Sequence, residues 1–269
     1  MEDNQKNVHL FWNNASCGEE LFLKGESDLD KYLNEAEMRY SLEPEIMSFA
    51  NFTEVSSKRV LEIGVGLGAD HQNFALNGAE LYGIDLTERA ISHTRRRLNL
   101  FGLSSTLKIA DAENLPFSDD FFDVIYSWGV IHHSTNTEKA VTEIFRTLKN
   151  GGEARIMIYN YYSMVGFMLW IRYALFTGNL RTTLSEIYDK YLESPGTKAY
   201  RKQEVLQMFS KFSSVSISSS LSHADLLTSD VGQRHRGLIL KFARIFYPRF
   251  IVRSLFSSFG LFLTIKAIK

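Results

Sequence analysis

The stretch from Val60 to Asp70, VLEIGVGLGAD, holds the residues whose types and spacing most clearly suggest chemistry. Its apolar start predicts a buried strand, and Gly64, Gly66 and Gly68 predict a turn that leads into a helix. Such a turn brings backbone N–H groups and a helix N-terminus close to a ligand, with no Cβ in the way. The stretch predicts a nucleotide-like cofactor, and with Ala69 it also fits the relaxed dinucleotide-binding pattern.

Polar residues follow three further predicted strands. Asp85 lies 21 positions beyond Gly64, where a carboxylate can accept hydrogen bonds from two vicinal ribose hydroxyls. Asp111 follows a third strand, and the segment from Ser127 to His133 continues a fourth. The carboxyl ends of parallel strands meet at one edge of a sheet, where ligands bind, so these residues are expected to form one site.

The elements that must position these residues alternate at short spacing. Strands are predicted at about 60–63, 79–84, 106–110, 122–127 and 154–159, and helices between them at 70–76, 87–101 and 136–148. This alternation is typical of an α/β protein with a parallel sheet and helices on both faces. In the second helix the run Arg95 to Arg97 is expected to face solvent, and Thr135 with Glu138 is expected to form a capping box for the third.

Five ordered motifs covering about residues 58 to 160 carry a family resemblance: VLEIGVGLGAD, GIDLT, DAENLPF, FDVIYSWGVIHH and LKNGGEARIMIY. Together they resemble the class I S-adenosylmethionine-dependent methyltransferases, and in particular the small-molecule enzymes related to quinone biosynthesis. The resemblance implies a Rossmann-like sheet of seven strands with helices on both faces. Its last two strands, at 214–221 and 261–267, would form an antiparallel pair. The implied cofactor is S-adenosylmethionine, and the implied product is S-adenosylhomocysteine.

The resemblance also assigns roles residue by residue. Gly64, Gly66 and Gly68 would pass beneath the methionine part of the cofactor, in a loop shaped with the help of Glu62. Asp85 would bind the ribose hydroxyls, and Leu86 would pack on the adenine. Asp111 would bind the adenine amino group, with Ala112 and Glu113 beside it. Ser127 and His132 would border the sulfonium and the acceptor.

Several other classes lack their required residues. Tyr159 to Ser163 does not supply the Tyr-x-x-x-Lys set of an NAD enzyme, and no Lys follows the glycines as in a P-loop. DNA amino-methyltransferases carry a Pro-Pro pair after the fourth strand, arsenic methyltransferases need several cysteines, and metal-dependent O-methyltransferases need paired carboxylates. The chain has none of these, so no metal is expected, and a small organic acceptor with an O, N or C nucleophile remains.

Composition limits the class of protein, its partners and its location. The 269 residues are 45% hydrophobic and 23% charged, as in ordinary globular proteins, and the net charge of −1 gives no electrostatic case for a nucleic-acid partner. Cys17 is the single cysteine, which excludes an internal disulfide. The polar, acidic start MEDNQKNVHL does not resemble a secretory signal, so a cytoplasmic location is expected. The sequence does not predict an oligomeric state.

Three segments are expected: an N-terminal helical lid at 1–56, the cofactor-binding core at 57–160, and cap helices, an insert and the final strand pair at 161–269. The lid should contain a helix that starts with a capping box of Ser27 and Asp30. Its apolar face is expected to be Leu29, Tyr32, Leu33, Ala36 and Tyr40.

Candidates for the chemistry form three groups. His132 or His133 could deprotonate an acceptor hydroxyl, or could simply pack beside the cofactor and cap a helix. Arg234, His235 and Arg236 could bind an anionic group, with His235 as a further proton-transfer candidate, or could be a solvated loop. In the third group, Tyr40 and Trp12 could close over the cofactor or the acceptor, or could simply pack, and Tyr159 is a further candidate for acceptor binding.

Two other hypotheses remain open. The apolar segment Tyr161 to Thr177 is interrupted by Arg172 and is short for a membrane span, so a buried helix under a cap is expected. Alternatively, this segment and the basic-aromatic segment Lys241 to Arg253 would lie at a membrane surface, in a peripheral lipid or quinone methyltransferase. The second hypothesis is a non-catalytic, pericyclase-like relative, which would keep the cofactor without transferring its methyl group.

Overall fold

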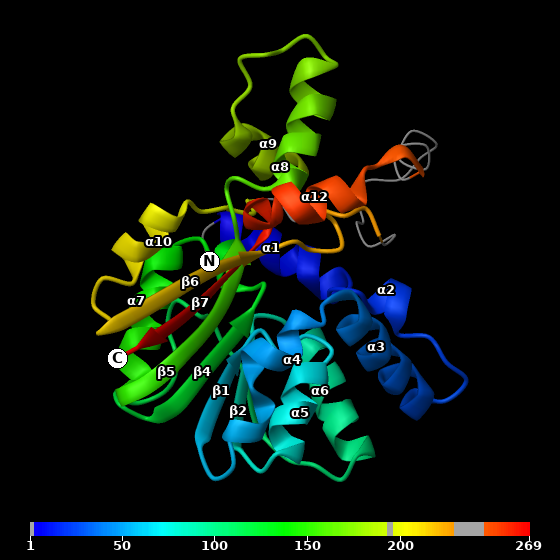
Figure 1. Ribbon diagram of the computed structural model, residues 1–269. Coiled ribbons are helices and arrows are strands. Elements are labelled where there is room, and N and C mark those ends of the chain that lie inside the picture. The colour runs from blue at the N-terminus through cyan, green and yellow to red at the C-terminus, as the bar shows by residue number, and fades with distance from the viewer. Residues whose placement is uncertain (1–2, 193–195, 229–244) are drawn as a thin grey trace.

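The computed structural model describes residues 3–192, 196–228 and 245–269, and within them the chain forms one seven-stranded sheet (Figure 1). The strand order is β3-β2-β1-β4-β5-β7-β6, with β7 antiparallel to both of its neighbours and the other neighbouring pairs parallel. The strands are β1 Arg59–Ile63, β2 Glu80–Asp85, β3 Thr106–Ile109, β4 Phe122–Trp128, β5 Leu148–Tyr159, β6 Ser214–Ser220 and β7 Phe262–Ile268. The predicted fold class is confirmed.

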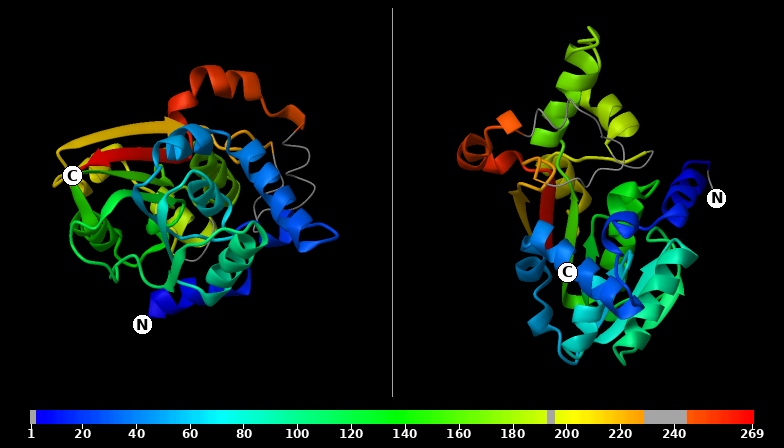
Figure 2. Two further views of the ribbon diagram at one scale, coloured as in Figure 1. Left: turned by 90° about the horizontal axis from the view of Figure 1, so that it is seen from below. Right: turned by 90° about the vertical axis from the view of Figure 1, so that its right-hand side faces the viewer.

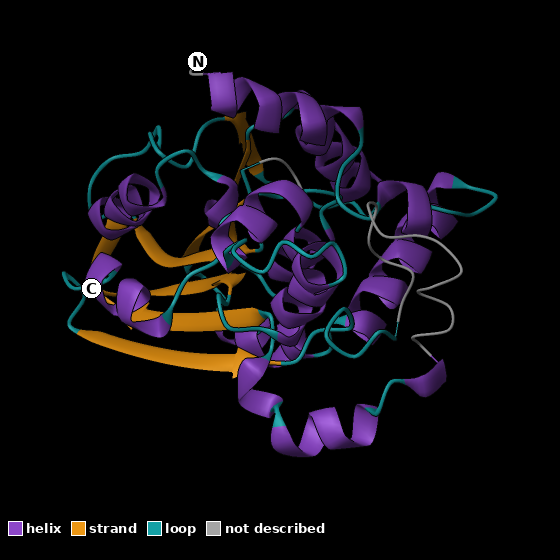
Figure 3. Ribbon diagram, turned by 90° about the horizontal axis from the view of Figure 1, so that it is seen from above, coloured by secondary structure: helices purple, strands orange, loops and turns teal. Residues whose placement is uncertain are grey.

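Helices lie on both sides of the sheet (Figures 2 and 3). On one face, α7 (Thr137–Thr147) and α10 (Lys202–Met208) bury apolar side chains against the strands, among them Ile144 and Val205. On the other face, α4 (Glu45–Ala50) and α5 (Ala69–Leu76) do the same through residues such as Phe49 and Phe74. Helix α6 (Glu88–Leu100) packs beside α5 and against β2 and β3. These two apolar layers hold the carboxyl ends of the strands in fixed positions.

The N-terminal segment is more helical than a lead-in to the first strand requires. It contains α1 (Asp3–Asn14), α2 (Glu19–Phe22) and α3 (Asp28–Leu42), with a 3₁₀ turn at Phe52–Glu54 after α4. The capping box of α3 is present as predicted, because Ser27 accepts from the backbone N–H of Asp30 and the Asp30 carboxylate accepts from the backbone N–H of Ser27.

The expected apolar face of α3 was wrong in part, because Leu29 and Leu33 are exposed whereas Glu35 is buried. Glu35 forms an ion pair with Arg97 of α6, which is also buried and donates to Gln72 Oε1 and to the Tyr32 carbonyl as well. The expectation that the whole arginine run 95–97 faces solvent was therefore wrong for Arg97. A buried guanidinium is tolerated there because its donors are matched by acceptors from three segments.

Two local predictions around α7 also need correction. The N-cap of α7 is Asn136, whose side chain accepts from the backbone N–H of Lys139, so the expected capping box of Thr135 and Glu138 is not formed. Strand β5 begins directly after the helix, at Leu148, because the chain from 148 onward already pairs with its sheet neighbours. The glycine pair at 151 and 152 thus lies inside the strand rather than before it.

The C-terminal half adds a projecting pair of helices. Helix α8 (Met164–Trp170) continues as a π-helix, Ile171–Leu175, and returns through α9 (Leu184–Tyr191); α12 (Arg249–Leu255) and a 3₁₀ turn (Ser257–Phe259) precede β7. Figure 1 shows α8 and α9 standing away from the sheet at the top of the view. The expectation of a buried helix at 161–177 was wrong, because only one side of it packs and side chains such as Phe167 and Phe176 are exposed. Among the described residues no helix is both long and apolar enough to cross a bilayer.

Candidate functional site

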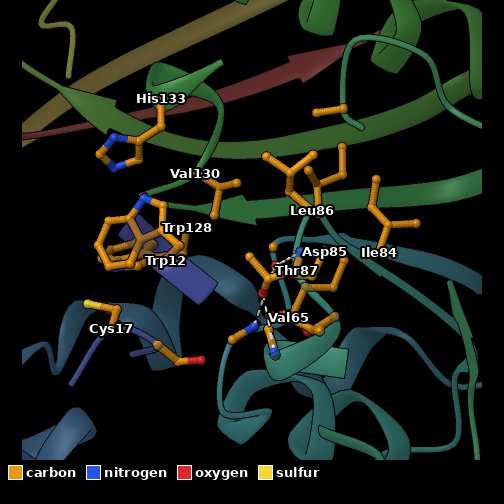
Figure 4. Close-up of a pocket in the computed structure, with 18 of the residues that line it drawn as sticks. Trp12, Cys17, Val65, Ile84, Asp85, Leu86, Thr87, Trp128, Val130 and His133 are labelled. Atoms are coloured by element: carbon orange, nitrogen blue, oxygen red, sulfur yellow. Dashed lines mark hydrogen bonds between the residues drawn. The ribbon is translucent and has the colours of Figure 1, made fainter. Parts of the chain in front are cut away.

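A cavity opens at the carboxyl ends of β1, β2 and β4, where the sequence predicted a ligand site. Figure 4 shows its two halves: Val65, Asp85 and Leu86 lie on one side, and Trp12, Trp128 and His133 lie on the other. The predicted cofactor residues on its wall are Glu62, Gly64, Gly66, Gly68, Asp85, Leu86, Asp111, Ala112 and Glu113. The structure therefore brings together, around one space, residues from three predicted strand ends and the loops after them.

The glycine loop is shaped for a ligand at one position and for packing at another. Gly64 and Gly66 both have positive φ, at 84° and 52°. A Cβ on Gly64 would lie 2.2 Å from Val130 Cγ2, so this glycine permits close packing against the segment after β4. A Cβ on Gly66 would meet no atom within 4 Å, so Gly66 leaves open the space that a ligand would fill. The loop is held in place by Thr94 of α6, whose hydroxyl donates to the Gly66 carbonyl at 3.1 Å.

The Asp85 carboxylate is fixed at the end of β2. One oxygen accepts from the backbone N–H and the hydroxyl of Thr87 at 3.0 and 2.9 Å, and the other accepts from the Gly66 N–H at 3.3 Å. Burial raises the pKa of Asp85, and these hydrogen bonds oppose that rise. The carboxylate lines the cavity with remaining acceptor capacity, which suits it to receive two hydroxyl donors.

The far end of the same half is built from the segment after β3. Asp111 accepts from the backbone N–H of Glu113 at 2.9 Å, which turns the chain at the cavity wall. Glu113 in turn accepts from the Asn136 N–H at 2.8 Å, so one of its oxygens joins this loop to the start of α7. Leu86 and Ala112 add apolar wall beside these carboxylates. A flat, partly polar group such as a purine matches this mixture.

Glu62 acts on the loop through a buried pair with His71. Glu62 Oε2 lies 2.8 Å from His71 Nδ1, and His71 Nε2 lies 2.8 Å from the Ser105 hydroxyl, which itself donates to the Leu81 carbonyl. Burial raises the pKa of Glu62 well above its usual range and lowers the pKa of His71 to about 3. The Ser105 hydroxyl uses its proton on the Leu81 carbonyl, so it must accept a hydrogen bond from His71 Nε2–H. In the neutral ring Nδ1 then carries no proton, and the proton between His71 and Glu62 is held by Glu62. The pair is a neutral hydrogen bond that ties the end of β1 to α5.

Asp70, at the start of α5, is the centre of a second buried network. It accepts from Arg39 Nη2 at 2.7 Å, from the Tyr40 hydroxyl at 2.9 Å and from the Tyr126 hydroxyl at 2.8 Å. Burial alone would raise the pKa of Asp70, but the charge and hydrogen bonds of Arg39 outweigh it and the pKa is lowered. Tyr40, expected near the acceptor, is instead a partner of Asp70 and Asn73, and it does not reach the cavity wall.

Glu43 and Glu35 are acidic residues of the cavity wall that the sequence did not single out, and Glu35 is paired with Arg97. Glu43 Oε2 accepts from Trp128 Nε1 at 2.9 Å and lies 3.7 Å from Arg39 Nη1. Burial raises the pKa of Glu43 to about 7, against the opposing charge of Arg39. Only the i,i+4 spacing from Arg39 hinted at this position, and such pairs are common on solvated helix faces. A carboxylate that titrates near neutral pH in a cavity is suited to accept a proton.

Ser127 and His132 do not line the cavity, in contrast to their expected place beside the sulfonium and the acceptor. Successive side chains of a strand point to opposite faces, so at the end of β4 it is Trp128 that faces the cavity and Ser127 that is buried behind it. His132 is fully buried, with its ring 4.0 Å from that of Tyr159, and neither ring nitrogen has a hydrogen-bond partner within the described ranges. Burial lowers its pKa well below the usual range, so His132 is neutral.

His133, Trp12 and Tyr159 lie where the sequence expected acceptor residues, on the cavity wall. The His133 ring is 5.5 Å from that of Trp12, and its Nδ1 is 3.2 Å from the Thr197 hydroxyl. Together with Trp128 and other residues they make this half of the cavity largely apolar; its further lining residues include Val8, Cys17, Met157 and Phe262. The predicted anion-binding residues Arg234, His235 and Arg236 lie outside the described residues.

The residues present fit an adenosyl cofactor. The open space at Gly66 lies beside the Asp85 carboxylate, and Asp111 with Leu86 extends that half of the wall. The second, apolar half offers room for an acceptor next to it, with Glu43 as a proton acceptor. The chemical capacity of the site is therefore to hold a polar cofactor and an apolar partner side by side.

The class of protein follows from this fold and site: the chain contains a class I S-adenosylmethionine-dependent methyltransferase fold. Residues 61–156 match the family model described as a methyltransferase domain. The resemblance predicted from the five motifs is thus confirmed for this part of the chain.

Three relatives illustrate the match. The core is 39% identical over 105 residues to phthiotriol/phenolphthiotriol dimycocerosates methyltransferase 1 of Mycobacterium ulcerans. This aligned segment covers 38% of each chain. The core is also 35% identical over 116 residues to the fatty-acid O-methyltransferase of Mycolicibacterium smegmatis, covering 42% of this chain and 41% of that one. The chain thus spans about two fifths of the length of these curated relatives.

A solved structure matches over nearly the whole chain. The geranyl diphosphate C-methyltransferase of Streptomyces coelicolor covers 99% of this chain and 98% of its own, with a TM-score of 0.63 and 13% identity. At this identity the likeness concerns the fold, which extends through the C-terminal half.

Proposed function

We propose that this protein is an S-adenosylmethionine-dependent methyltransferase that methylates a small, largely apolar organic acceptor and releases S-adenosylhomocysteine. The observation that carries the proposal is the divided cavity, with Val65, Asp85 and Leu86 in one half and Trp12, Trp128 and His133 in the other (Figure 4). The proposal also draws support from the methyltransferase-domain match over residues 61–156.

When bound, the cofactor supplies an electrophilic methyl group on a sulfonium. The residues of this chain would then bind and orient. Asp85 would accept the ribose hydroxyls, Asp111 and Leu86 would hold the adenine, and the open space at Gly66 would admit the methionine part. The aromatic half would exclude water from the reacting atoms and hold the acceptor in line, since positioning supplies most of the rate in such a displacement.

Glu43 is the proposed proton acceptor. In O- or N-methylation, the Glu43 carboxylate would accept the proton that the acceptor hydroxyl or amine loses when it receives the methyl group. The hydrogen bond from Trp128 Nε1 fixes the orientation of the carboxylate, and its pKa of about 7 leaves it largely ionised just above neutral pH. His133, expected as a base from the sequence, also lines this half and is the second candidate.

The acceptor is proposed to be lipid-like. The wall of the acceptor half is mostly apolar, and two relatives are named for the methylation of phthiotriol dimycocerosates and of fatty acids. A long-chain alcohol offers an apolar body for the aromatic residues and a hydroxyl whose proton Glu43 would accept, whereas a long-chain acid is already ionised and would be methylated without a base. Whether the methyl goes to O, N or C is decided by product analysis.

The test is a turnover assay with S-adenosylmethionine and a panel of long-chain acids and alcohols, with S-adenosylhomocysteine and methylated product both quantified. Stoichiometric formation of the two products from one acceptor supports the proposal. Tight cofactor binding with no methyl transfer to any acceptor would instead favour the pericyclase-like alternative. The predicted anion site is tested in the same assay, since Arg234→Ala should lower turnover without loss of cofactor binding if that arginine binds a carboxylate.

A further inference from the structure

Exposed apolar side chains are concentrated on one part of the molecule. Of the 21 large hydrophobic residues that are exposed in the described part of the chain, 12 lie between 162 and 180 or between 245 and 259. The most exposed of each group, which define what we call the apolar platform, are Phe167, Phe176, Leu180, Phe246, Phe250 and Leu255. Twelve exposed apolar side chains in two segments are more than scattered single exposures, and such concentrations mark interaction sites.

The two parts of the platform are joined at their base. The buried Asp225 carboxylate accepts from the backbone N–H of Val165 in α8 at 3.0 Å and from that of Leu261, just before β7, at 2.7 Å. Tyr247, before α12, donates its hydroxyl to the Asp225 carbonyl at 2.8 Å. Both helices therefore stand on one anchored point, and Figures 1 and 2 show them at the same end of the molecule.

The platform also adjoins the acceptor half of the cavity. Tyr159, which lines the cavity, ends β5 a few residues before α8 begins. Phe262, which also lines the cavity, starts β7 directly after the segment that contains α12. A ligand that enters beside the platform would meet these two residues.

Charge separates this region from the rest of the sequence. The described segments 161–185 and 245–259 contain four arginines, Arg172, Arg181, Arg249 and Arg253, and no Asp or Glu; Glu186 and Asp189 follow on α9. The remainder of the chain contains 26 Lys and Arg against 31 Asp and Glu. On the described platform itself, Arg172, Arg181 and Arg253 are exposed among the apolar side chains. Clustered basic and aromatic residues on a helical surface match an anionic membrane interface.

We propose that the apolar platform docks the protein on an anionic phospholipid bilayer, with α8 and α12 lying in the headgroup region and the acceptor cavity facing the lipid. The exposed phenylalanines would enter the acyl boundary, and the arginines would contact lipid phosphates. A second copy of this chain is the weaker candidate occupant, because two such surfaces would bring together the arginines of segments 161–185 and 245–259, which contain no acidic residue.

Vesicle co-sedimentation tests the proposal on the full chain. Vesicles of mixed phosphatidylglycerol and phosphatidylcholine should sediment the protein, and vesicles of phosphatidylcholine alone should do so at least tenfold less. Phe176→Ser and Phe250→Ser should each weaken the binding about tenfold, because each removes one aromatic ring that would enter the lipid. The controls are Leu76→Ser and Ile109→Ser, which change exposed apolar residues on α5 and β3, away from the platform, and should leave binding unchanged.

The charge contribution has its own matched pair. Arg253→Gln should weaken binding to the anionic vesicles about fivefold, whereas Arg95→Gln, an exposed arginine on α6, should have no effect. Absence of vesicle binding by the wild type would overturn the proposal, as would equal loss in the platform and control variants. Dimerisation that is abolished by Phe250→Ser, without lipid binding, would identify a second copy as the occupant. Because vesicle binding needs no turnover, its failure is distinguishable from failure of the methyltransferase proposal.

Discussion

Replacing Glu43 by Gln should make the protein more stable at alkaline pH and at the same time much less active. The amide keeps an oxygen for the hydrogen bond from Trp128 Nε1 and keeps the volume, but it cannot accept a proton. Loss of a general base typically lowers kcat by about 10²–10⁴-fold. The wild-type rate should rise as pH increases through about 7, where Glu43 loses its proton, and this rise should be absent in the variant.

The stability effect has a definite sign. The pKa of Glu43 is raised from 4.5 to about 7, so the folded state holds the proton more tightly than the unfolded state. This stabilisation is fully present below pH 4.5 and is lost as the pH rises through about 7. At about 1.4 kcal/mol per pKa unit, the loss amounts to about 3 kcal/mol. A Gln side chain stays neutral, so Glu43→Gln should be up to about 3 kcal/mol more stable than wild type at pH 8 and similar to it at pH 4.

Urea denaturation at both pH values and single-turnover kinetics across the pH range measure these effects. The matched control is Glu37→Gln, which removes the same charge from an exposed position on α3 and should change neither quantity by more than a small amount. A Glu43→Gln protein that keeps wild-type kcat and an inflection near pH 7 would refute the assignment of Glu43 as proton acceptor.

Three further results are expected. Gly66→Ala should weaken cofactor binding at least tenfold with a small loss in Tm, because the Cβ would enter the space for the ligand. Gly64→Ala should lower the free energy of unfolding by several kcal/mol, because its Cβ would collide with Val130. Cofactor titration and thermal unfolding of both variants measure these effects. Arg39→Met should destabilise the fold by about 3–5 kcal/mol, because it leaves the Asp70 carboxylate buried without its cation, and a stability close to wild type would show that the network does not depend on it. His132→Phe should retain kcat within a few-fold, since this ring is neutral and buried away from the cavity, and a loss of 100-fold in the same assay would restore His132 as a candidate base.

The part of the site that could be predicted from sequence is the part encoded locally. The glycine loop, Asp85 and Asp111 each lie at the end of a strand or within two residues of it, so the periodicity that reveals the strand also places the residue. The Ser27 and Asp30 capping box was predictable for the same reason, since all its contacts lie within four residues.

The part that could not be predicted depends on contacts between distant segments. Glu43 becomes a cavity residue only because Trp128, 85 positions away, donates to it. Arg97 is buried because Glu35 of α3 meets it, although its own helix pattern favours a solvated run. Ser127 was misplaced because a shift of one residue at a strand end exchanges the side chain that faces the cavity for the one behind it. His132 was misplaced because it lies in a 3₁₀ turn after that strand, where the alternation of the strand no longer applies.

Calorimetric titration of wild type and Asp85→Ala with S-adenosylmethionine and with NAD tests the central proposal most directly. We expect micromolar binding of S-adenosylmethionine and none of NAD, with affinity weakened at least tenfold in Asp85→Ala, because two hydrogen bonds to a charged group are lost. Binding of NAD without binding of S-adenosylmethionine would contradict the cofactor assignment and, with it, the roles of Asp111 and Leu86.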